Sequence, residues 1–533
     1  MPVTQTTGAP TSGRPLTIAD ILEEMADVIG ERAALITLDH TYTFAELDER
    51  STRLANHLVS IGIKPGDHVA VHAPNRIEWV DAFYGCLKAR AVPININYRY
   101  LADELDYLYR NSDSVAAIIA PEYVEIVTSL DLPQLKSMLV MGADYDAALA
   151  AASPERKITG RSEDDHYMLY TGGTTGNPKG VVWRNADIVV GALNASRFGA
   201  PIESVEALAQ EAAANENPMV LLACGPMMHG GSQWIFGNAH VAGCPVGFYT
   251  EPSFDAAKIL DLVEHAKVIS LTFLGDAMGR PVAEAILAEP DRWDLSALAA
   301  VSNGAAPLSD GVRDEIRKAL PGRFILDSYG SSESGATASR MDDGTEGPSG
   351  APKFSASPEV EVFDVNLKPA AVGVEGILGR TGAVPLGYYK DPVKTDATFK
   401  VIDGVRWVLP GDAARREEDG TISLLGRGSV CINTGGEKVH PEEVEAVLLR
   451  HDEVFDAAVV GTAHERWGQQ VTALIQRREG SDVTAEQLRE HCKSLISGYK
   501  VPKEFLFVDA VPRTPVSKVD YPGSTELANK LLS

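Results

Sequence analysis

Short apolar strand patterns and amphipathic helix patterns alternate along the first hundred residues, and this alternation restricts the fold more than any other feature. Residues 68–72 and 91–96 are typical of buried strands, and residues 77–89 between them are typical of a helix. Thr43 and Glu46 form a capping-box pattern at the start of an earlier helix, which Gly62 ends. The pattern predicts an α/β fold in which helices cover parallel or mixed sheets.

Length, charge and cysteine content narrow the class of protein. The 533 residues predict roughly three or four folding units. A net charge of −26 disfavours nucleic acid as a partner. No stretch approaches the ~20 apolar residues of a membrane span, and residues 1–15 are predicted to be a disordered tail rather than a signal peptide. Five cysteines without C-x-x-C spacing argue against disulfides or zinc and favour a reducing cytoplasm.

Residues 170–180 read Tyr-Thr-Gly-Gly-Thr-Thr-Gly-Asn-Pro-Lys-Gly and follow a short apolar run typical of a buried strand. Glycines let backbone N–H groups approach an anion closely, while threonine hydroxyls and Lys179 add donors and positive charge. The spacing differs from the P-loop, because Lys179 comes one residue late and is followed by glycine. The segment predicts a phosphate-binding loop rather than an ordinary glycine-rich surface loop.

This loop resembles the phosphate loop of the adenylate-forming superfamily, which includes acyl-CoA synthetases, peptide-synthetase adenylation domains and firefly-type luciferases. The family usually has serine where this chain has Gly172, a departure that removes one hydroxyl group. The resemblance implies that Thr174 has a catalytic role. It also implies that the loop holds ATP through Thr171, Gly172, Gly173, Thr174, Thr175, Gly176 and Lys179.

Four further segments match the superfamily in the expected order. Residues 302–308 resemble the adenine-side loop, and residues 327–333 resemble the Tyr-Gly-x-Thr-Glu element. The resemblance implies that Tyr329 stacks on adenine, that Ser332 contacts the α-phosphate, and that Glu333 is a catalytic ligand of Mg²⁺. Taken alone, the two segments are also compatible with a strand-to-helix turn and a solvated Ser/Glu loop. Further ATP contacts are implied for Gly304, Ala305, Ala306, Asp327, Ser328, Gly330 and Ser331.

Residues 407–412 resemble the Trp-x-x-Thr-Gly-Asp element, with Pro410 where threonine is common. The resemblance implies that Asp412 takes both ribose hydroxyls, since a carboxylate has two acceptor oxygens. The plain alternative is a Gly-Asp turn pair. Arg427 is implied to reach ribose or phosphate from the domain junction. Asp419-Gly420 predicts a hairpin turn between residues 407–408 and 421–425.

The chain after Gly428 has the pattern of a small α+β unit. Pro441 is predicted to open a helix, residues 457–460 and 471–476 are predicted strands, and Thr484 is a predicted helix cap. We therefore expect an N-terminal domain over residues 16–427 and a mobile lid over residues 428–533. The resemblance places the hinge at Ser429.

The resemblance also implies roles for lid residues. Gly435, Gly436 and Glu437 are implied to line the CoA channel, although the glutamates of residues 437–445 are better interpreted as a solvated helix start. Residues 512–519 resemble the Pro-x-Thr-x-x-Gly-Lys element, with Ser517 in place of glycine, so Lys518 is implied to be the catalytic lysine that also contacts ATP.

His229 resembles the family's gate beside the substrate carboxylate, a catalytic role in which it orients the acid or moves aside for pantetheine. A helix-capping or core histidine is the plain alternative. Relatives that activate amino acids usually carry an aspartate shortly after this position, and residues 230–236 contain no acid. An uncharged, apolar acyl group is therefore expected. The proposed pocket walls, which are equally compatible with core positions, are His229, Gly230, Trp234, Phe273 and Met278.

Together the motifs imply an ATP- and Mg²⁺-dependent acid–CoA ligase that forms acyl-AMP and pyrophosphate, then acyl-CoA and AMP. Residues 170–183 and 426–444 look most like fatty-acyl and steroid-side-chain CoA synthetases of actinobacteria, and an aryl acid is also compatible. One alternative is an acyl-adenylating enzyme that serves a carrier protein or an oxidative reaction. Another is a non-catalytic ligand-binding relative, suggested by the departures at Gly172, Pro410 and Ser517. A homodimer is compatible with the sequence.

Overall fold

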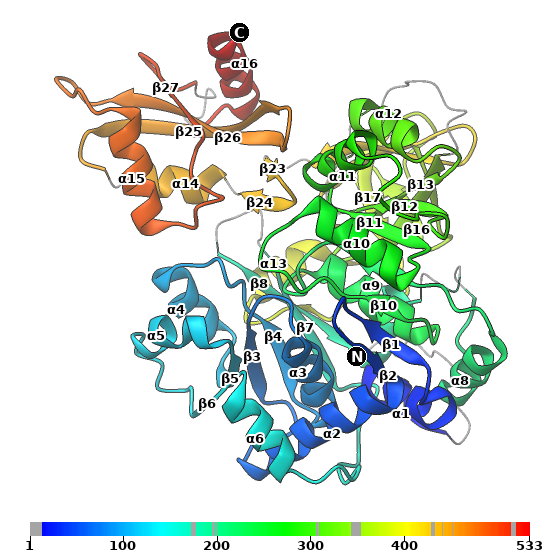
Figure 1. Ribbon diagram of the computed structural model, residues 1–533. Helices are drawn as coiled ribbons and strands as arrows, with labels where there is room; N and C mark the ends of the chain where they lie inside the picture. Colours follow the sequence, from blue (N-terminus) through cyan, green and yellow to red (C-terminus); the bar gives the residue numbers. More distant parts are fainter. Residues whose placement is uncertain are drawn as a thin grey trace.

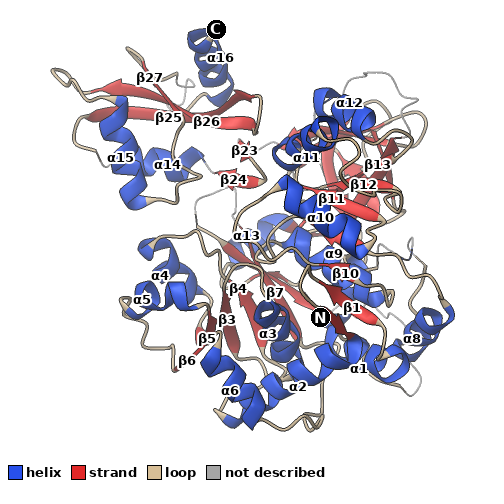
Figure 2. Cartoon of the chain, viewed as in Figure 1, coloured by secondary structure: helices blue, strands red, loops and turns tan. Residues whose placement is uncertain are grey.

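The computed structural model describes residues 13–171, 177–194, 197, 200–304, 308, 310–342, 353–427, 432–439, 441–449, 451–512 and 519–533. Its helices and strands form a large body and a smaller C-terminal unit, which lies against one end of the body (Figure 1). Strands of three sheets make up the interior of the body, and helices cover them (Figure 2).

The largest sheet of the described residues contains fifteen strands and joins a parallel half to an antiparallel half. The path from β1 through β10, β9, β11 and β12 to β13 is parallel. The strands of this sheet are β1 (Ala33–Ile36), β2 (Thr41–Thr43), β9 (Leu221–Ala223), β10 (Val246–Gly247), β11 (Ser270–Phe273), β12 (Ala300–Asn303), β13 (Phe324–Ser331), β14 (Gly335–Asp342), β15 (Lys353–Ala356), β16 (Val360–Phe363), β17 (Glu375–Arg380), β19 (Phe399–Ile402), β20 (Val405–Val408), β21 (Asp412–Arg416) and β22 (Ile422–Arg427).

Two smaller sheets complete the body. The parallel one contains β3 (His68–His72), β4 (Val92–Asn95), β5 (Ser114–Ile119) and β6 (Ser137–Val140), and the antiparallel one contains β7 (His166–Thr171), β8 (Lys179–Arg184) and β18 (Gly387–Tyr388). The helices of the body are α1 (Ile18–Ile29), α2 (Phe44–Ser60), α3 (Ile77–Lys88), α4 (Ala102–Asn111), the 3₁₀ turn η1 (Pro121–Tyr123), α5 (Val124–Thr128), α6 (Ala143–Ala151), α7 (Asn185–Gly191), α8 (Val205–Ala214), α9 (Gly230–Val241), α10 (Ala256–Ala266), α11 (Asp276–Ala288), α12 (Asp310–Ala319) and α13 (Pro392–Thr398).

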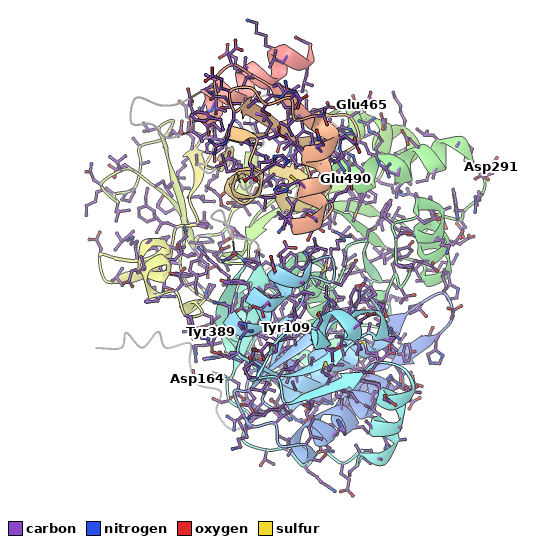
Figure 3. All side chains as sticks on the ribbon, turned by 90° about the vertical axis from the view of Figure 1, so that its left-hand side faces the viewer. Tyr109, Asp164, Asp291, Tyr389, Glu465 and Glu490 are labelled. Carbon is purple, nitrogen blue, oxygen red and sulfur yellow. The ribbon has the colours of Figure 1, made fainter. Side chains whose placement is uncertain are left out.

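The C-terminal unit has its own sheet and its own apolar core, in which Val444, Val459, Ile475 and Leu488 are buried. Figure 3 shows this unit, with Glu465 and Glu490, above the part of the body that carries Tyr109 and Tyr389. Its elements are β23 (Ile432–Thr434), β24 (Glu437–Val439), α14 (Pro441–Leu448), β25 (Val454–His464), β26 (Gly468–Arg477), α15 (Ala485–Leu495), β27 (Glu504–Phe507) and α16 (Tyr521–Leu532).

The expected α/β architecture is confirmed, and most local predictions are accurate to a residue or two. Strand β3 has the predicted bounds, and the capping boxes at Thr43 and Thr484 are both formed. Arg14, which the sequence places in the terminal tail, instead pairs with Glu23 at 2.8 Å. The described residues contain no helix long and apolar enough to cross a membrane.

The predicted hairpin at Asp419-Gly420 has the wrong first strand. The turn exists, but β22 pairs with β21 rather than with residues 407–408. Those residues belong to β20, which pairs with β19 across Asp403-Gly404. Both turn residues have positive φ values, 50° and 81°, as a tight hairpin turn requires. The Asp403-Gly404 turn therefore joins β20 to β19, so residues 407–408 are not the hairpin partner of β22.

We expect Thr43→Ala to lower the free energy of unfolding by about 1 kcal/mol, because the Thr43 hydroxyl caps the backbone N–H of Glu46 at 3.2 Å. Urea titration of the full chain measures the change. Thr41→Ala, on an exposed strand position, is the matched control, and an equal loss in both variants would contradict a capping effect.

Candidate active site

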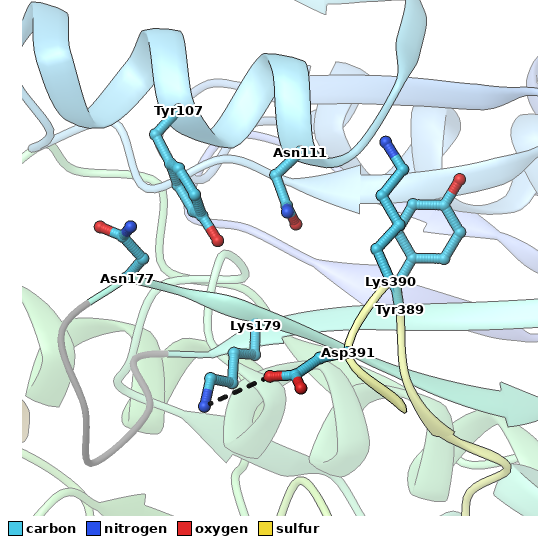
Figure 4. A pocket seen from close by; sticks show the side chains of 7 residues that line it. All are labelled: Tyr107, Asn111, Asn177, Lys179, Tyr389, Lys390 and Asp391. Carbon is cyan, nitrogen blue, oxygen red and sulfur yellow. Dashed lines mark ion pairs between the residues drawn. The ribbon is translucent and has the colours of Figure 1, made fainter. Parts of the chain in front are cut away.

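Strands β7 and β8 form an antiparallel hairpin that begins the proposed phosphate loop. Their register places Thr171 opposite Lys179. The Lys179 ammonium lies 3.7 Å from Asp391 and faces a cavity of about 280 Å³ (Figure 4). Burial, together with nearby Lys394, lowers the pKa of Lys179. The hairpin therefore presents a partly desolvated cation beside the loop.

Tyr329 and Asp412 meet although 83 residues separate them, because the Tyr329 hydroxyl donates a hydrogen bond to Oδ2 of Asp412. Asp412 begins β21 and is 4% exposed. The strand register places Arg427 opposite Asp412. The structure thus brings together the three positions predicted to hold the adenosine moiety, although the Arg427 side chain lies outside the description.

Asp327 is buried beneath this region rather than open to a ligand. Its carboxylate accepts hydrogen bonds from Nη2 of Arg313 at 2.9 and 2.8 Å and from Nδ2 of Asn303 at 3.3 Å. Arg313 also donates to the carbonyl of Leu308 at 3.2 Å. These contacts join strand β13, which carries Tyr329, to the end of the adenine-side loop, so the structure gives Asp327 a supporting position. Gly304, which directly follows β12, lies close to the backbone of the exposed Ser328 within β13.

The turn between β13 and β14 presents Glu333. Trp183 Nε1 donates to the carbonyl of Ser332 at 3.1 Å, and the Tyr388 hydroxyl donates to Oε1 of Glu333 at 2.9 Å. A Cβ atom at Gly330 would lie 2.2 Å from the carbonyl oxygen of Gly335, so this close turn requires glycine. The hydroxyl groups of Ser331 and Ser334 are hydrogen-bonded to each other within this turn.

His229 meets the C-terminal unit. Its Nε2 lies 3.2 Å from Oε1 of Glu437, which also pairs with Arg99. Burial alone would raise the pKa of Glu437, but His229 and Arg99 outweigh it, so that pKa lies below its usual value. Glu437 therefore remains a carboxylate at neutral pH.

Gly435 and Gly436 form the two-residue turn between β23 and β24, and their φ values are 58° and 84°. Two successive positive φ values favour glycine strongly. A Cβ atom at Gly436 would lie 3.3 Å from that of Leu274 in the body. The turn therefore brings backbone, rather than side chains, up to the body beside His229.

The proposed acyl-pocket residues lie in different surroundings. Gly230 begins α9, where a Cβ atom would lie 2.4 Å from a methyl group of Leu169. Trp234 is half-buried against the main apolar core. Phe273 is buried in the core around β11, and Met278 packs against that core. Whether Phe273 and Met278 reach the acyl group stays a prediction.

Asn95, which no sequence motif identified, connects two parts of the site. Its Nδ2 donates to the carbonyls of Tyr170 at 2.9 Å and Met228 at 2.7 Å, and its Oδ1 accepts from Tyr170 N–H at 2.8 Å. Asn95 thereby connects the strand before the phosphate loop to the residue before His229. A single buried asparagine at the end of a strand gives no recognisable sequence signal.

A second contact between the body and the C-terminal unit was likewise not predicted from the sequence. The Lys500 ammonium lies 2.5 Å from Oε1 of Glu104, and the Ser497 hydroxyl donates to Oε2 of Glu104 at 2.7 Å. The Lys500 side chain is 5% exposed. Together with the Glu437 contacts, this pair defines the observed placement of the C-terminal unit.

Several predicted site residues lie outside the described residues, so the structure says nothing about them. They are Gly172, Gly173, Thr174, Thr175, Gly176, Ala305, Ala306, Ser429 and Lys518.

Comparison with known proteins agrees with this architecture. Residues 22–389 match the family model of the AMP-binding enzyme, and residues 443–518 match that of the AMP-binding enzyme C-terminal domain. The chain is 41% identical to the 3-oxocholest-4-en-26-oate–CoA ligase of Rhodococcus rhodochrous, over 95% of both chains. It is also 41% identical to a medium/long-chain-fatty-acid–CoA/3-oxocholest-4-en-26-oate–CoA ligase of Mycolicibacterium smegmatis, over 95% of both chains.

Among solved structures, the fold is shared with o-succinylbenzoate CoA synthetase from Bacillus subtilis, with a TM-score of 0.79 and 23% identity over 95% of this chain and 98% of that one. The chain belongs to the AMP-binding enzymes, and within them to the acyl-CoA ligases. Enzymes of this class use ATP and CoA.

Proposed function

We propose that this protein joins an uncharged, apolar carboxylic acid to CoA in two steps at the site described above. The observation that carries the proposal is the contact of Glu437 with His229, which brings the proposed CoA channel at Gly435, Gly436 and Glu437 to the proposed acyl gate. Asp412, Tyr329 and Lys179 belong to the body and are assigned to ATP.

In the first step, a carboxylate oxygen attacks the α-phosphorus of ATP, and pyrophosphate leaves. Both reactants are anionic, so the residues act by positioning and by neutralising charge. Lys179 and the threonine loop hold phosphate oxygens, Asp412 holds the ribose, and Tyr329 packs on adenine. Lys518 is assigned to the reacting carboxylate and α-phosphate while the lid is closed for this step.

Glu333 is the proposed ligand of Mg²⁺. The described residues contain no group of three or more His, Cys, Asp or Glu side chains that could hold a metal. A single carboxylate fits Mg²⁺, which proteins commonly bind through one or two carboxylates together with substrate phosphates. When bound, Mg²⁺ neutralises phosphate charge. The chain itself contributes Glu333 to the proposed Mg²⁺ site, together with the hydrogen bond that Glu333 accepts from Tyr388.

In the second step, the CoA thiol attacks the acyl-AMP carbonyl, and AMP leaves. The described placement of the C-terminal unit suits this step, because β23 and β24 face His229 and Glu437 holds the imidazole. Because Glu437 already holds the imidazole in this placement, we assign the placement to an open path for the pantetheine arm. We assign the change between the two placements to rotation about Ser429, with the body over residues 16–427 and the lid over residues 428–533.

The acid is proposed to be a fatty acid or a steroid side-chain acid. The relatives' names support this, and helix α9, which follows His229, contains no carboxylate that would hold an amino group. The four described cysteines are free and buried, which supports a cytoplasmic location. A homodimer remains a proposal without a described interface.

The proposal is tested by measuring pyrophosphate release with and without CoA across fatty, aryl and steroid acids. We expect slow release without CoA, faster turnover with CoA, and acyl-CoA as the product of fatty or steroid acids. Adenylation without transfer to CoA would support a carrier-protein or oxidative enzyme, and no ATP-dependent reaction would support a ligand-binding relative.

We expect Glu437→Gln to slow transfer from synthetic acyl-AMP to CoA by about tenfold. This is the effect of replacing a charge-assisted hydrogen bond with a neutral one that is about 1.5 kcal/mol weaker. Pyrophosphate release in the absence of CoA should be unaffected. The depressed pKa means that the carboxylate contact is present at neutral pH and is lost only as the pH falls below the ordinary carboxyl range. Glu442→Gln, at the start of the adjacent helix, is the control. Equal slowing of both half-reactions would contradict the assignment.

A further inference from the structure

Tyr388 lies between two groups that are proposed to act on the polyphosphate of ATP. Its hydroxyl donates to Oε1 of Glu333 at 2.9 Å, and the Lys179 ammonium lies 5.7 Å from the centre of its ring. Tyr388 and Glu333 are 55 residues apart in sequence. No sequence motif singles out Tyr388, and the proposed mechanism gives it only the hydrogen bond to Glu333.

The backbone fixes the direction of the Tyr388 side chain. Strand β18 pairs with β8 in a register that places Tyr388 opposite Val181, two residues beyond Lys179. The Tyr388 N–H donates to Oγ1 of Thr395 at 2.9 Å, and Phe399 packs against the ring, with centroids 5.9 Å apart. The hydroxyl is therefore held toward Glu333 by contacts that do not involve Glu333.

The other side of the contact is equally constrained. Trp183 holds the carbonyl of Ser332, and the buried Arg380 donates to the carbonyls of Ser334 and Gly191. The backbone on both sides of Glu333 is thus anchored, and one carboxylate oxygen is bound by Tyr388. A carboxylate held in this way has a fixed plane, and its remaining lone pairs have defined directions.

We propose that Tyr388 is a positioning residue that orients the Glu333 carboxylate toward a metal–polyphosphate ligand. The inference rests on the proposed assignment of Glu333 to Mg²⁺. Because the phenol O–H donates a hydrogen bond to one oxygen, it supports the charged carboxylate and leaves the second oxygen to the metal. Tyr388 therefore acts on the binding of metal-bound ATP, and it has no part in holding CoA or AMP.

Tyr388→Phe removes the hydroxyl and keeps the ring, and Tyr389→Phe is its matched control. The Tyr389 hydroxyl donates to Asp113 at 2.8 Å, away from Glu333. Binding of Mn²⁺ to the full-length protein with a non-hydrolysable ATP analogue is measured by electron paramagnetic resonance. We expect Tyr388→Phe to weaken Mn²⁺ binding by about tenfold, as for loss of an outer-shell hydrogen bond, and Tyr389→Phe to leave it unchanged.

AMP affinity and acyl transfer from synthetic acyl-AMP should be unchanged in Tyr388→Phe. Glu333→Gln tests the assignment of Glu333 to the metal separately from the positioning role of Tyr388. If Glu333→Gln leaves Mn²⁺ binding intact, the metal assignment itself is wrong. If Glu333→Gln weakens Mn²⁺ binding and Tyr388→Phe does not, the assignment stands and the positioning role is overturned. A lower unfolding temperature in Tyr388→Phe without a change in metal binding also overturns it, since the contact would then be purely structural.

Discussion

Replacing Lys518 with alanine is expected to slow acyl-AMP formation by a factor on the order of 10²–10⁴, the range for removing one preorganised charge-stabilising group. The same variant should convert synthetic acyl-AMP and CoA to acyl-CoA at a near-wild-type rate. The reason is that Lys518 belongs to the lid and is assigned to the site only in the placement that forms acyl-AMP. Single-turnover measurement of each half-reaction tests this selectivity.

Lys500 provides the opposite case within the same lid. In the described placement its ammonium pairs with Glu104 of the body at 2.5 Å and is almost fully buried. Because we assign the described placement to CoA transfer, we expect Lys500→Ala to slow acyl transfer and to spare acyl-AMP formation. The two lysine variants are therefore expected to affect different half-reactions. If each slowed both half-reactions equally, a lid with two functional placements would not apply to this protein.

Much of the fold could be predicted from local signals, because single residues determine where helices begin and strands turn. The Thr43 and Thr484 capping boxes and the buried strand β3 are examples. Strand pairing was harder to predict. Asp403-Gly404 and Asp419-Gly420 are similar turn signals, and each joins two strands that are adjacent in sequence, β19 to β20 and β21 to β22. Sequence periodicity contains no information about which of two such strands becomes the neighbour.

In the site, too, local motifs could be predicted from the sequence, whereas contacts between segments could not. Motifs identified Tyr329 and Asp412 separately, and the structure joins them by a hydrogen bond. No motif identified Asn95 or Tyr388, because each makes its contacts through the polar end of a side chain that a separate strand positions. Asp327 shows the reverse, since its motif position suggested a ligand contact while its carboxylate is committed to Arg313. A motif locates a segment, but the direction of each side chain depends on packing.

Asp412→Ala is expected to weaken ATP binding by a factor on the order of 10²–10⁴, measured by calorimetry on the full chain. The carboxylate is assigned to two ribose hydroxyls, and a hydrogen bond to a charged group contributes about 1.5–3 kcal/mol. The loss should appear for both ATP and AMP, because ribose is held in both half-reactions.

The Tyr329 contact requires a control, since Asp412→Ala also removes the acceptor of that hydroxyl. Tyr329→Phe deletes the hydroxyl and keeps the ring. If Asp412 acts on ribose directly, Tyr329→Phe should therefore lower the affinity for ATP far less than Asp412→Ala does. Dideoxy-ATP, which lacks both ribose hydroxyls, completes the test. Wild type should bind it weakly, and Asp412→Ala should bind it about as well as it binds ATP, because the missing hydroxyls and the missing carboxylate remove the same interaction. If wild type bound ATP and dideoxy-ATP equally, Asp412 would serve to hold Tyr329 in place, and the ribose contact would lie elsewhere in the site.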